Sequence, residues 1–229
     1  MDDFTCTLAI IVRNELPGSR DLHPRIDWNA FQQVLVIDGH SIDGTREFYE
    51  SQNLRVITQS AVGLGAAMLE ARAHCETEAI VFFHPDGNER PNDVLEIRRL
   101  LASGHEFVVG TRMVHGSRNE EDGQLLRPRK WANQVIAACA NLLWASDGNR
   151  TTDATNGLRG IRCATWDRLN LDAHDCSMDL QMVIRALKNR VPITEIPVLE
   201  DPRLNGETHF GAISTGFAEL NLMLRELVS

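Results

Sequence analysis

Residues 82–91 read FFHPDGNERP and end an apolar run with several side chains that can bind ions. His84 and Asp86 are two residues apart, a spacing that puts both side chains on the same side of an extended chain. Asn88 can add a third ligand from the turn. Oxygen ligands suit Mg²⁺ and an imidazole favours Mn²⁺, so the stretch predicts a divalent-cation site that clamps a diphosphate. A plain polar turn is the alternative, because Pro, Asp, Gly and Asn are common turn residues.

A second acidic turn, VIDGHSIDGT, spans residues 36–45. Asp38 ends its apolar run, where a carboxylate can accept hydrogen bonds from a ribose or a base. Asp43 precedes Gly44 and Thr45 and is equally suited to capping a helix or binding a ligand. We expect Asp38 to be functional, because a carboxylate at the edge of a sheet is costly without a partner.

The stretch GLGAAM, residues 63–68, follows a predicted strand and opens a predicted helix. It resembles the dinucleotide fingerprint G-x-G-x-x-G, but Met68 stands at the third glycine position. Close packing at the start of a helix explains Gly63 and Gly65 equally well. The Walker pattern GxxxxGK[ST] does not occur in the sequence.

Arginines cluster in RPRK, residues 127–130, with Arg112 and Arg118 before it. Such a cluster is either a solvated surface or a place where an anionic acceptor docks. A third polar stretch, DATNGLRGIR at 153–162, combines a carboxylate with glycines and arginines and is either a turn into a strand or part of a site.

The composition excludes several classes of protein. The 229 residues fit one large domain, and a net charge of −9 argues against a nucleic-acid binder. Apolar runs stay well short of the roughly 20 residues needed to span a bilayer, and the first residues do not resemble a signal peptide. Five scattered cysteines without a CxxC pair favour a reducing cytosol. We therefore expect a soluble cytoplasmic protein.

The chemical stretches must be positioned by an α/β fold. Short apolar runs alternate with helical patterns, and this predicts a mostly parallel sheet flanked by helices, as in Rossmann-like folds. The predicted strands are 7–12, 33–38, 54–58, 79–83, 106–110 and 192–198. Ligands bind beyond the carboxyl ends of such strands, where Asp38 and Asp86 fall.

The second half is less regular. Residues 111–130 read as a loop, and an amphipathic helix follows at 130–145. A C-terminal helix carries an apolar stripe formed by Ile213, Phe217, Leu220, Leu224 and Leu227. We expect this stripe to lie in the core or at a dimer surface, with contact to a membrane as the alternative.

Taken together, the motifs resemble family 2 glycosyltransferases, most closely the dolichyl- or polyprenyl-phosphate mannose synthase-like group. VIDGHSIDGT, GLGAAMLEA, FFHPDGNERP, VVGTRM, NGLRGIR and ITEIPV…GETHF stand in the order and spacing typical of that family, from about residue 7 to about residue 210. The resemblance implies a GT-A type nucleotide-diphospho-sugar transferase fold in a single domain, 1–229. Its nucleotide-sugar-binding half would be about 1–110 and its acceptor half about 111–229.

The resemblance also implies roles for individual residues. The residues that bind the nucleotide sugar would be Asn14, Glu15, Asp38, Gly65 and Asp86. The metal, Mn²⁺ or Mg²⁺, would be held by Asp86, Asn88 and His84, although His84 stands where the family usually has the first acid of Asp-x-Asp. Arg112 and either Arg129 or Arg127 would face an acceptor phosphate. Asp153, Asn156, Gly157 and Arg159 match the family segment near the sugar, with Asp153 as the candidate base for a hydroxyl acceptor.

We therefore expect an inverting hexosyltransferase that uses a nucleotide sugar and a sugar, lipid-phosphate or other acceptor. It would be cytoplasmic or peripheral at the inner face of the membrane, and its oligomeric state, monomer or homodimer, is open. A sugar-phosphate nucleotidyltransferase, a non-catalytic nucleotide-sugar-binding protein and a dinucleotide-dependent oxidoreductase are the alternatives.

Overall fold

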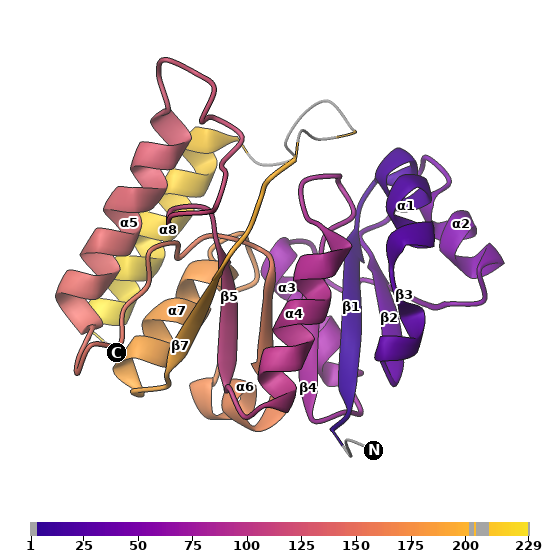
Figure 1. Ribbon diagram of the computed structural model, residues 1–229, viewed down its shortest axis with the longest axis horizontal. Helices are drawn as coiled ribbons and strands as arrows, with labels where there is room; N and C mark the ends of the chain where they lie inside the picture. The colour runs from indigo at the N-terminus through magenta and orange to yellow at the C-terminus, as the bar shows by residue number, and fades with distance from the viewer. Residues whose placement is uncertain (1–3, 202–203, 205–210, 229) are drawn as a thin grey trace.

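A seven-stranded sheet forms the centre of the protein (Figure 1). The computed structural model describes residues 4–201, 204 and 211–228, so the GETHF segment at 206–210 lies outside the described residues. The strands are β1 (Cys6–Val12), β2 (Gln33–Asp38), β3 (Arg55–Thr58), β4 (Ala79–Phe83), β5 (Phe107–Thr111), β6 (Arg159–Arg162) and β7 (Ile193–Pro197). Their order is β3-β2-β1-β4-β6-β5-β7, and only β6 pairs antiparallel to its neighbours.

Helices cover both faces of this sheet. The helices are α1 (Leu16–Leu22), α2 (Thr45–Ser51), α3 (Leu64–Ala73), α4 (Pro91–Ala102), α5 (Pro128–Trp144), α6 (Cys163–Leu169), α7 (Met178–Lys188) and α8 (Ala212–Val228), with short 3₁₀ turns η1 (His23–Arg25) and η2 (Trp28–Ala30). Along β1, Leu8 and Ile10 point into the core shared with α1, α2 and α4, whereas Ala9 points toward α3 and α5 to α8. The predicted mostly parallel α/β fold is confirmed.

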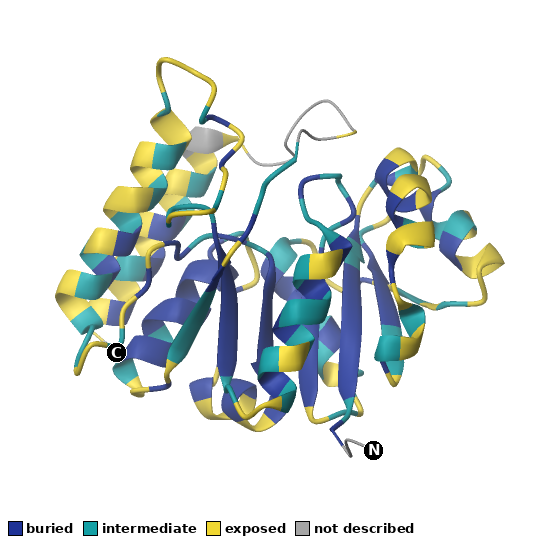
Figure 2. Ribbon diagram, viewed as in Figure 1, coloured by how far each residue is buried: buried dark blue, intermediate teal, exposed yellow. Residues whose placement is uncertain are grey.

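The central strands are buried on both sides, which explains their unbroken apolar sequences (Figure 2). In Figure 1 the chain enters β1 at the lower edge, so the carboxyl ends of the parallel strands form the upper edge. This edge gathers the turns after β1, β2 and β4, the loop after β5, and the first turns of α5 and α8. The fold thereby brings the candidate residues of both predicted halves to one place.

The C-terminal helix is oriented differently from one of our expectations. Both α5 and α8 pack against α7, and Leu222 of α8 is 4% exposed. The stripe residues Phe217, Leu220, Leu224 and Leu227 are instead 50–62% exposed. The core part of the prediction is therefore wrong, and a dimer surface or a membrane contact stays a prediction. On the opposite face Glu226 is 2% exposed and binds Arg185 and Lys188 of α7. The side chain of Ile213 lies outside the described part of the chain.

Among the described residues, no helix combines the length and the apolar character needed to cross a membrane.

Candidate functional site

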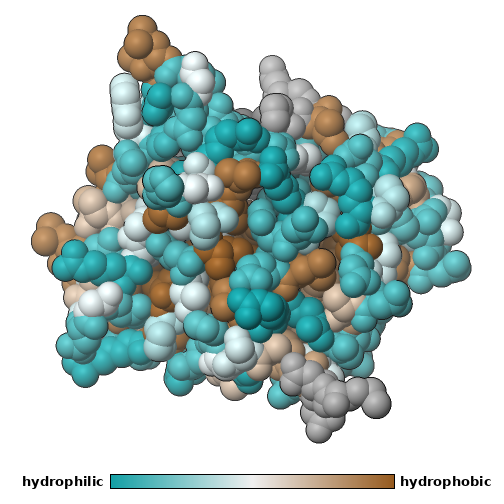
Figure 3. Space-filling view, in the orientation of Figure 1, coloured by the Kyte–Doolittle hydropathy of each residue, from teal (hydrophilic) through white to brown (hydrophobic). Residues whose placement is uncertain are grey.

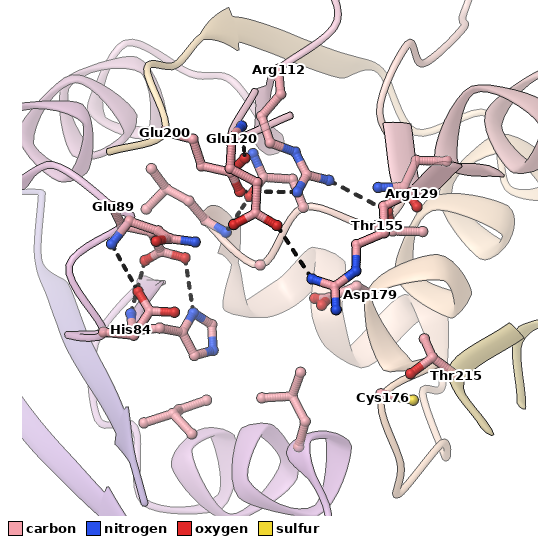
Figure 4. Close-up of a pocket in the computed structure, with 18 of the residues that line it drawn as sticks. His84, Glu89, Arg112, Glu120, Arg129, Thr155, Cys176, Asp179, Glu200 and Thr215 are labelled. Atoms are coloured by element: carbon pink, nitrogen blue, oxygen red, sulfur yellow. Dashed lines mark hydrogen bonds and ion pairs between the residues drawn. The ribbon is translucent and has the colours of Figure 1, made fainter. Parts of the chain in front are cut away.

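A cavity of about 730 Å³ lies at the carboxyl edge of the sheet. Its lining comes from the strand ends and turns after β1, β2 and β4, the loop after β5, the start of α5 and part of α8. Figure 4 shows His84 and Glu89, from the turn after β4, across the cavity from Thr215 of α8. Its polar or charged lining includes Arg13, Glu15, His40, Gln59, His84, Asp86, Asn88, Glu89, Asp93, Arg112, Asn119, Glu120, Glu121, Arg129, Asn133, Thr155, Asn156, Asp179, Glu200, Thr215 and Glu219. Its volume is in the range of small-molecule binding sites.

Hydrogen bonds join the turn after β1 to the turn after β2. Asn14 adopts a left-handed conformation with φ of 57°, and its Oδ1 accepts a hydrogen bond from the backbone N–H of Ile42 at 2.8 Å. Glu15 follows and lines the cavity while 7% exposed. Asn14 does not line the cavity, so the structure gives it the role of joining the two turns.

Asp38 and Asp43 stabilise the second turn. The carboxylate of Asp38 is 1% exposed and accepts from the backbone N–H of Ser41 at 3.2 and 3.3 Å. Asp38 therefore shapes the turn, whose Gly39 and His40 line the cavity in its place. Burial alone would raise the pKa of Asp43, but hydrogen bonds from Thr45 and from the N–H groups of Leu16 and Thr45 lower it. This favours the structural alternative for Asp43.

Gly65 is positioned by close packing. A Cβ atom on Gly65 would lie 2.2 Å from the carbonyl oxygen of Ala173. The N–H groups of Gly65 and Ala66 donate to the carbonyls of Asp175 and His174 at 3.0 and 2.9 Å. A phosphate at this helix start would need those N–H groups, so the geometry favours the packing alternative over the predicted contact with the nucleotide sugar.

The turn after β4 brings Asp86 and Asn88 to the cavity. The N–H of Asn88 donates to Asp86 Oδ1 at 2.9 Å, and Gly87 between them has a φ of 99° that favours glycine. Gly18 of α1 lies so close that a Cβ on it would be 1.9 Å from the carbonyl oxygen of Pro85. Asn88 is 5% exposed, and its Oδ1 has no hydrogen-bond partner among the described residues. A buried acceptor without a donor is costly, and a cation would satisfy it.

His84 is held in a different way. Its Nδ1 is 2.9 Å from Glu89 Oε1, and its backbone N–H donates to Glu89 Oε2 at 2.8 Å (Figure 4). Burial alone would lower the pKa of His84, but the charge and hydrogen bond of Glu89 outweigh it and raise the pKa to about 9. A protonated imidazole has no lone pair for a metal ion. The raised pKa, rather than the position of the imidazole, therefore disfavours the predicted ligation by His84.

The described residues contain no group of three or more His, Cys, Asp or Glu side chains placed to hold a metal ion. Asp86 and Asn88 nevertheless fit a hard divalent cation, because both residues line the same cavity and the buried Oδ1 of Asn88 has no hydrogen-bond partner among the described residues. Mg²⁺ is usually bound by one or two carboxylates together with substrate phosphates and water.

Arg112 lines the cavity and binds two carboxylates. Its Nε and Nη2 donate to the two oxygens of Asp153 at 2.7 and 2.9 Å, and its Nη1 donates to Glu200 at 3.1 Å. The Asp153 side chain has no exposed surface and is not part of the cavity lining. Burial alone would raise the pKa of Asp153, but the charge and hydrogen bonds of Arg112 lower it. Such a carboxylate cannot reach an acceptor hydroxyl, so the geometry is unsuited to the predicted role of general base.

The two candidate arginines of the RPRK cluster differ in their position relative to the cavity. Arg129, in the first turn of α5, lines the cavity and lies 3.3 Å from Glu120 with 45% of its side chain exposed. Arg127 pairs with Asp122 and does not line the cavity. Asn156 and Gly157 also line the cavity, whereas the fully buried Arg159 lies behind it and pairs with Asp179.

Several cavity carboxylates were missed from the sequence, among them Asp179 and Glu219. Asp179 begins α7, and burial raises its pKa against the attraction of Arg159. Glu219 of α8 is 6% exposed, and burial followed by the charge of Asp179 raises its pKa to about 7. The signal in the sequence was the position of Glu219 opposite the apolar stripe of its helix.

Comparisons with known proteins agree with this architecture. The sequence pattern of glycosyl transferase family 2 matches residues 25–185. The chain is 27% identical over 189 residues to glycosyltransferase AglJ of Haloferax volcanii, which covers 82% of this chain and 60% of the relative. The chain thus spans about 60% of the length of that curated relative.

Solved structures of glucosyl-3-phosphoglycerate synthase from Mycobacterium tuberculosis have the same fold. The complex with Mn²⁺, UDP and glucosyl-3-phosphoglycerate is 16% identical with a TM-score of 0.70, and covers 99% of this chain and 81% of its own. The complex with Mn²⁺, UDP-glucose and phosphoglyceric acid is 17% identical with a TM-score of 0.71, and covers 99% and 80%. The expected GT-A type fold is confirmed.

Proposed function

The chain belongs to glycosyl transferase family 2, and we propose that it transfers a sugar from a nucleoside diphosphate sugar to an acceptor. The observation that carries this proposal is the composition of the cavity. Asp86, Asn88, Arg112 and Arg129 all line it, and the buried Oδ1 of Asn88 has no hydrogen-bond partner among the described residues. This arrangement suits a ligand pair in which a diphosphate lies near the oxygens and a second anion lies near the guanidinium groups.

Asp86 and Asn88 would hold Mn²⁺ or Mg²⁺. Solved complexes of the structurally similar synthase contain Mn²⁺ or Mg²⁺ together with UDP, which supports this assignment. The ion would supply Lewis-acid neutralisation of the diphosphate as negative charge develops on it. His84 would stay outside the metal shell and orient the turn through Glu89.

We infer an inverting single displacement. An acceptor oxygen attacks the anomeric carbon, and the bond from that carbon to the diphosphate oxygen breaks on the opposite face, so the diphosphate leaves with the electron pair. Glu15, Gly39 and His40 would surround the nucleoside, because they line the cavity beside the first two strand ends. Their turns are fixed by Asn14 and Asp38, which makes the nucleoside side of the site rigid before the donor binds.

For the acceptor we propose a lipid phosphate. A phosphate monoester has its second pKa near 6 and needs no strong base at neutral pH. This agrees with Asp153, which is locked by Arg112 and cannot serve as a base. Arg112 would provide a fixed contact for the acceptor phosphate, and the more exposed Arg129 an adjustable one. A hydroxyl acceptor would instead need Asp179 or Glu219 as base.

An apolar surface beside the cavity supports a lipid-linked acceptor. Leu125 and Leu126, in the loop before α5, are 94% and 66% exposed. Further exposed apolar side chains lie on α5 and α8, namely Trp131, Val135, Leu142, Phe217, Leu220, Leu224 and Leu227. Figure 3 shows apolar side chains projecting at the upper left and left edge, over the loop before α5 and over α5. Residues 131–144 contain no charged side chain. This surface would rest on a bilayer, and a second copy of the chain is the alternative occupant.

A transfer assay tests the proposal. UDP-, GDP-, dTDP- and CDP-sugars would be incubated with Mn²⁺ and either a short polyprenyl phosphate or a simple glycoside as acceptor. We expect transfer to the phosphate, and R129A should raise the KM for this acceptor by roughly 10-fold or more because it loses a charge-assisted contact. R127A is the matched control and should remain close to wild type.

Three outcomes would contradict the proposal. Equal effects of R129A and R127A would remove the acceptor assignment. Donor binding without any hydrolysis or transfer would indicate a non-catalytic binding protein. Formation of a nucleotide sugar from a nucleoside triphosphate and a sugar phosphate would indicate a nucleotidyltransferase.

A further inference from the structure

Two cysteines face each other at the edge of the sheet opposite the cavity. Cys75 follows α3 and Cys163 begins α6, 88 residues later in the chain. Their Sγ atoms are 3.5 Å apart. Neither residue lines the cavity, and the neighbouring Thr7 lies at the start of β1, where the amino ends of the parallel strands meet. The pair is therefore separate from the site described above.

The surroundings of Cys75 can stabilise a thiolate. Its Sγ lies 3.3 Å from the hydroxyl of Thr7 and 3.4 Å from the hydroxyl of Thr77. Arg72 is near enough for its positive charge to interact with both sulfur atoms. The positive charge of Arg72 favours a thiolate, whereas the Thr7 hydroxyl donates to Gln33 and accepts from the Cys75 thiol.

The two thiols differ in acidity. The pKa of Cys75 is lowered to about 5, first because the thiol of Cys163 donates to it, against the effect of burial. The pKa of Cys163 is raised because its thiol donates the hydrogen bond to Cys75 and because it is buried. The pair thus loses its first proton easily and its second with difficulty. Burial raises the pKa of Cys6 to about 12, so that buried cysteine stays a thiol.

The two cysteines also differ in exposure, and the difference suits Cys75 as the thiol that reacts first and Cys163 as its partner. Cys75 is partly exposed and can meet a small oxidant from solution, whereas Cys163 is 8% exposed and is within reach of Cys75. A nucleophilic, accessible cysteine beside a shielded second one is the arrangement of a redox-active dithiol.

We propose that Cys75 and Cys163 form a reversible disulfide when the protein meets a hydroperoxide. The Cys75 thiolate attacks one peroxide oxygen, the O–O bond breaks, and the other oxygen leaves as hydroxide or alkoxide and takes up a proton. Cys163 then attacks the sulfur of the resulting sulfenic acid. The S–S bond forms, the S–O bond breaks, and the hydroxyl leaves as water with the proton of Cys163. Two electrons pass from the thiols to the peroxide, and a dithiol reductant reverses the change.

The disulfide would connect the two halves of the molecule. It would tie the end of α3 to the start of α6 and enclose the chain segment that carries Asp86, Arg112 and Asp153. Cross-links that close long loops reduce the freedom of the unfolded chain. We expect the melting temperature to rise by roughly 5–15 °C, a large loop-closure effect for a protein of this size. The cavity lies at the other edge of the sheet and should bind its ligands unchanged.

The test uses the purified full chain, reduced, desalted and treated with a small excess of hydrogen peroxide. We expect a loss of about 2 Da, as two hydrogen atoms leave. We also expect a non-reducing digest that links the peptides of Cys75 and Cys163, and a higher melting temperature that dithiothreitol reverses. C75S and C163S should lose all three changes, whereas C139S and C176S serve as matched controls and should keep them.

The reduced variants are melted alongside wild type, so that a folding defect is separated from a lost disulfide. The proposal is overturned if oxidised wild type keeps both thiols open to alkylation. It is also overturned if peroxide only adds oxygen at Cys139 or Cys176, or if C75S still forms the same cross-link mass. These outcomes do not depend on sugar transfer, so they leave the proposed function unaffected.

Discussion

Replacing Asp153 with asparagine should destabilise the protein strongly. The substitution keeps the shape of the side chain but removes the charge that faces Arg112 in a fully buried position. Breaking a buried pair costs about 3–5 kcal/mol when it leaves a charge uncompensated. Arg112 keeps its contact with Glu200, so we expect the lower end of that range, about 3 kcal/mol. The melting temperature should fall by roughly 6–12 °C for a chain of this size.

Denaturant unfolding at neutral pH measures this change, with D21N as the control. Asp21 pairs with Arg25 on the surface, where both side chains are 52% exposed, and such a pair contributes at most about 1 kcal/mol. If D153N and D21N unfold within about 1 kcal/mol of each other, the reasoning about the buried pair is refuted.

The same variant has a defined pH dependence. The pKa of Asp153 in the folded state lies below the usual value of 3.8, so its contribution is present above that value and is lost as the pH falls toward the folded pKa. The difference between wild type and D153N should therefore hold from pH 8 to about pH 5 and shrink below about pH 4. An acidic limb of the pH–rate profile that disappears in D153N would instead show that Asp153 acts as a base.

Three further substitutions test other parts of the structure. G18A should cost roughly 1–3 kcal/mol in urea unfolding, because its Cβ would lie 1.9 Å from the Pro85 carbonyl oxygen, whereas G123A has nothing within 4 Å and should be neutral. E219Q should increase the stability of the protein at pH 8 but not at pH 4. The pKa of Glu219 is raised to about 7, so the folded state favours the protonated carboxyl and loses stability as the pH rises through 7. An unchanged pH slope in E219Q would contradict this assignment. The double variant L125D/L126D should no longer co-sediment with phospholipid vesicles, whereas I42D, at another exposed position, should still do so. If wild type dimerises without binding vesicles, and L125D/L126D is monomeric, a second copy of the chain is the occupant instead.

Much of the fold could be predicted because local patterns determine it. The strands from β1 to β5 are short apolar runs between turn residues, and their observed bounds lie within one residue of the predicted ones. The strand β6 was left undecided because its sequence, Arg-Gly-Ile-Arg, does not look like a buried strand. Arg159 can be buried there only because Asp179 and the carbonyl of Asn156 receive its guanidinium group. Such a partnership joins distant residues and leaves no local pattern.

The candidate site was predicted less completely for the same reason. Asp86 and Asn88 follow a strand, so their position could be read from the sequence. The locking of Asp153 by Arg112 joins residues 41 apart, and the burial of Glu226 depends on Arg185, also 41 residues away. The inward position of Glu219 follows from that orientation of α8. Pairing of this kind is decided by tertiary packing, and it changed the roles we assign to His84 and Asp153.

The most direct test of the account is calorimetric titration of nucleoside diphosphate sugars into wild type and D86N, with and without Mn²⁺. We expect at least one donor to bind wild type and Mn²⁺ to tighten this binding by 10-fold or more, on the order of a contact worth 1.4 kcal/mol. D86N should lose the tightening. Asp86 lines the cavity without being part of the core, so D86N should remain folded. Equal Mn²⁺ dependence in D86N and wild type, or no donor binding by folded wild type, would contradict the central claim.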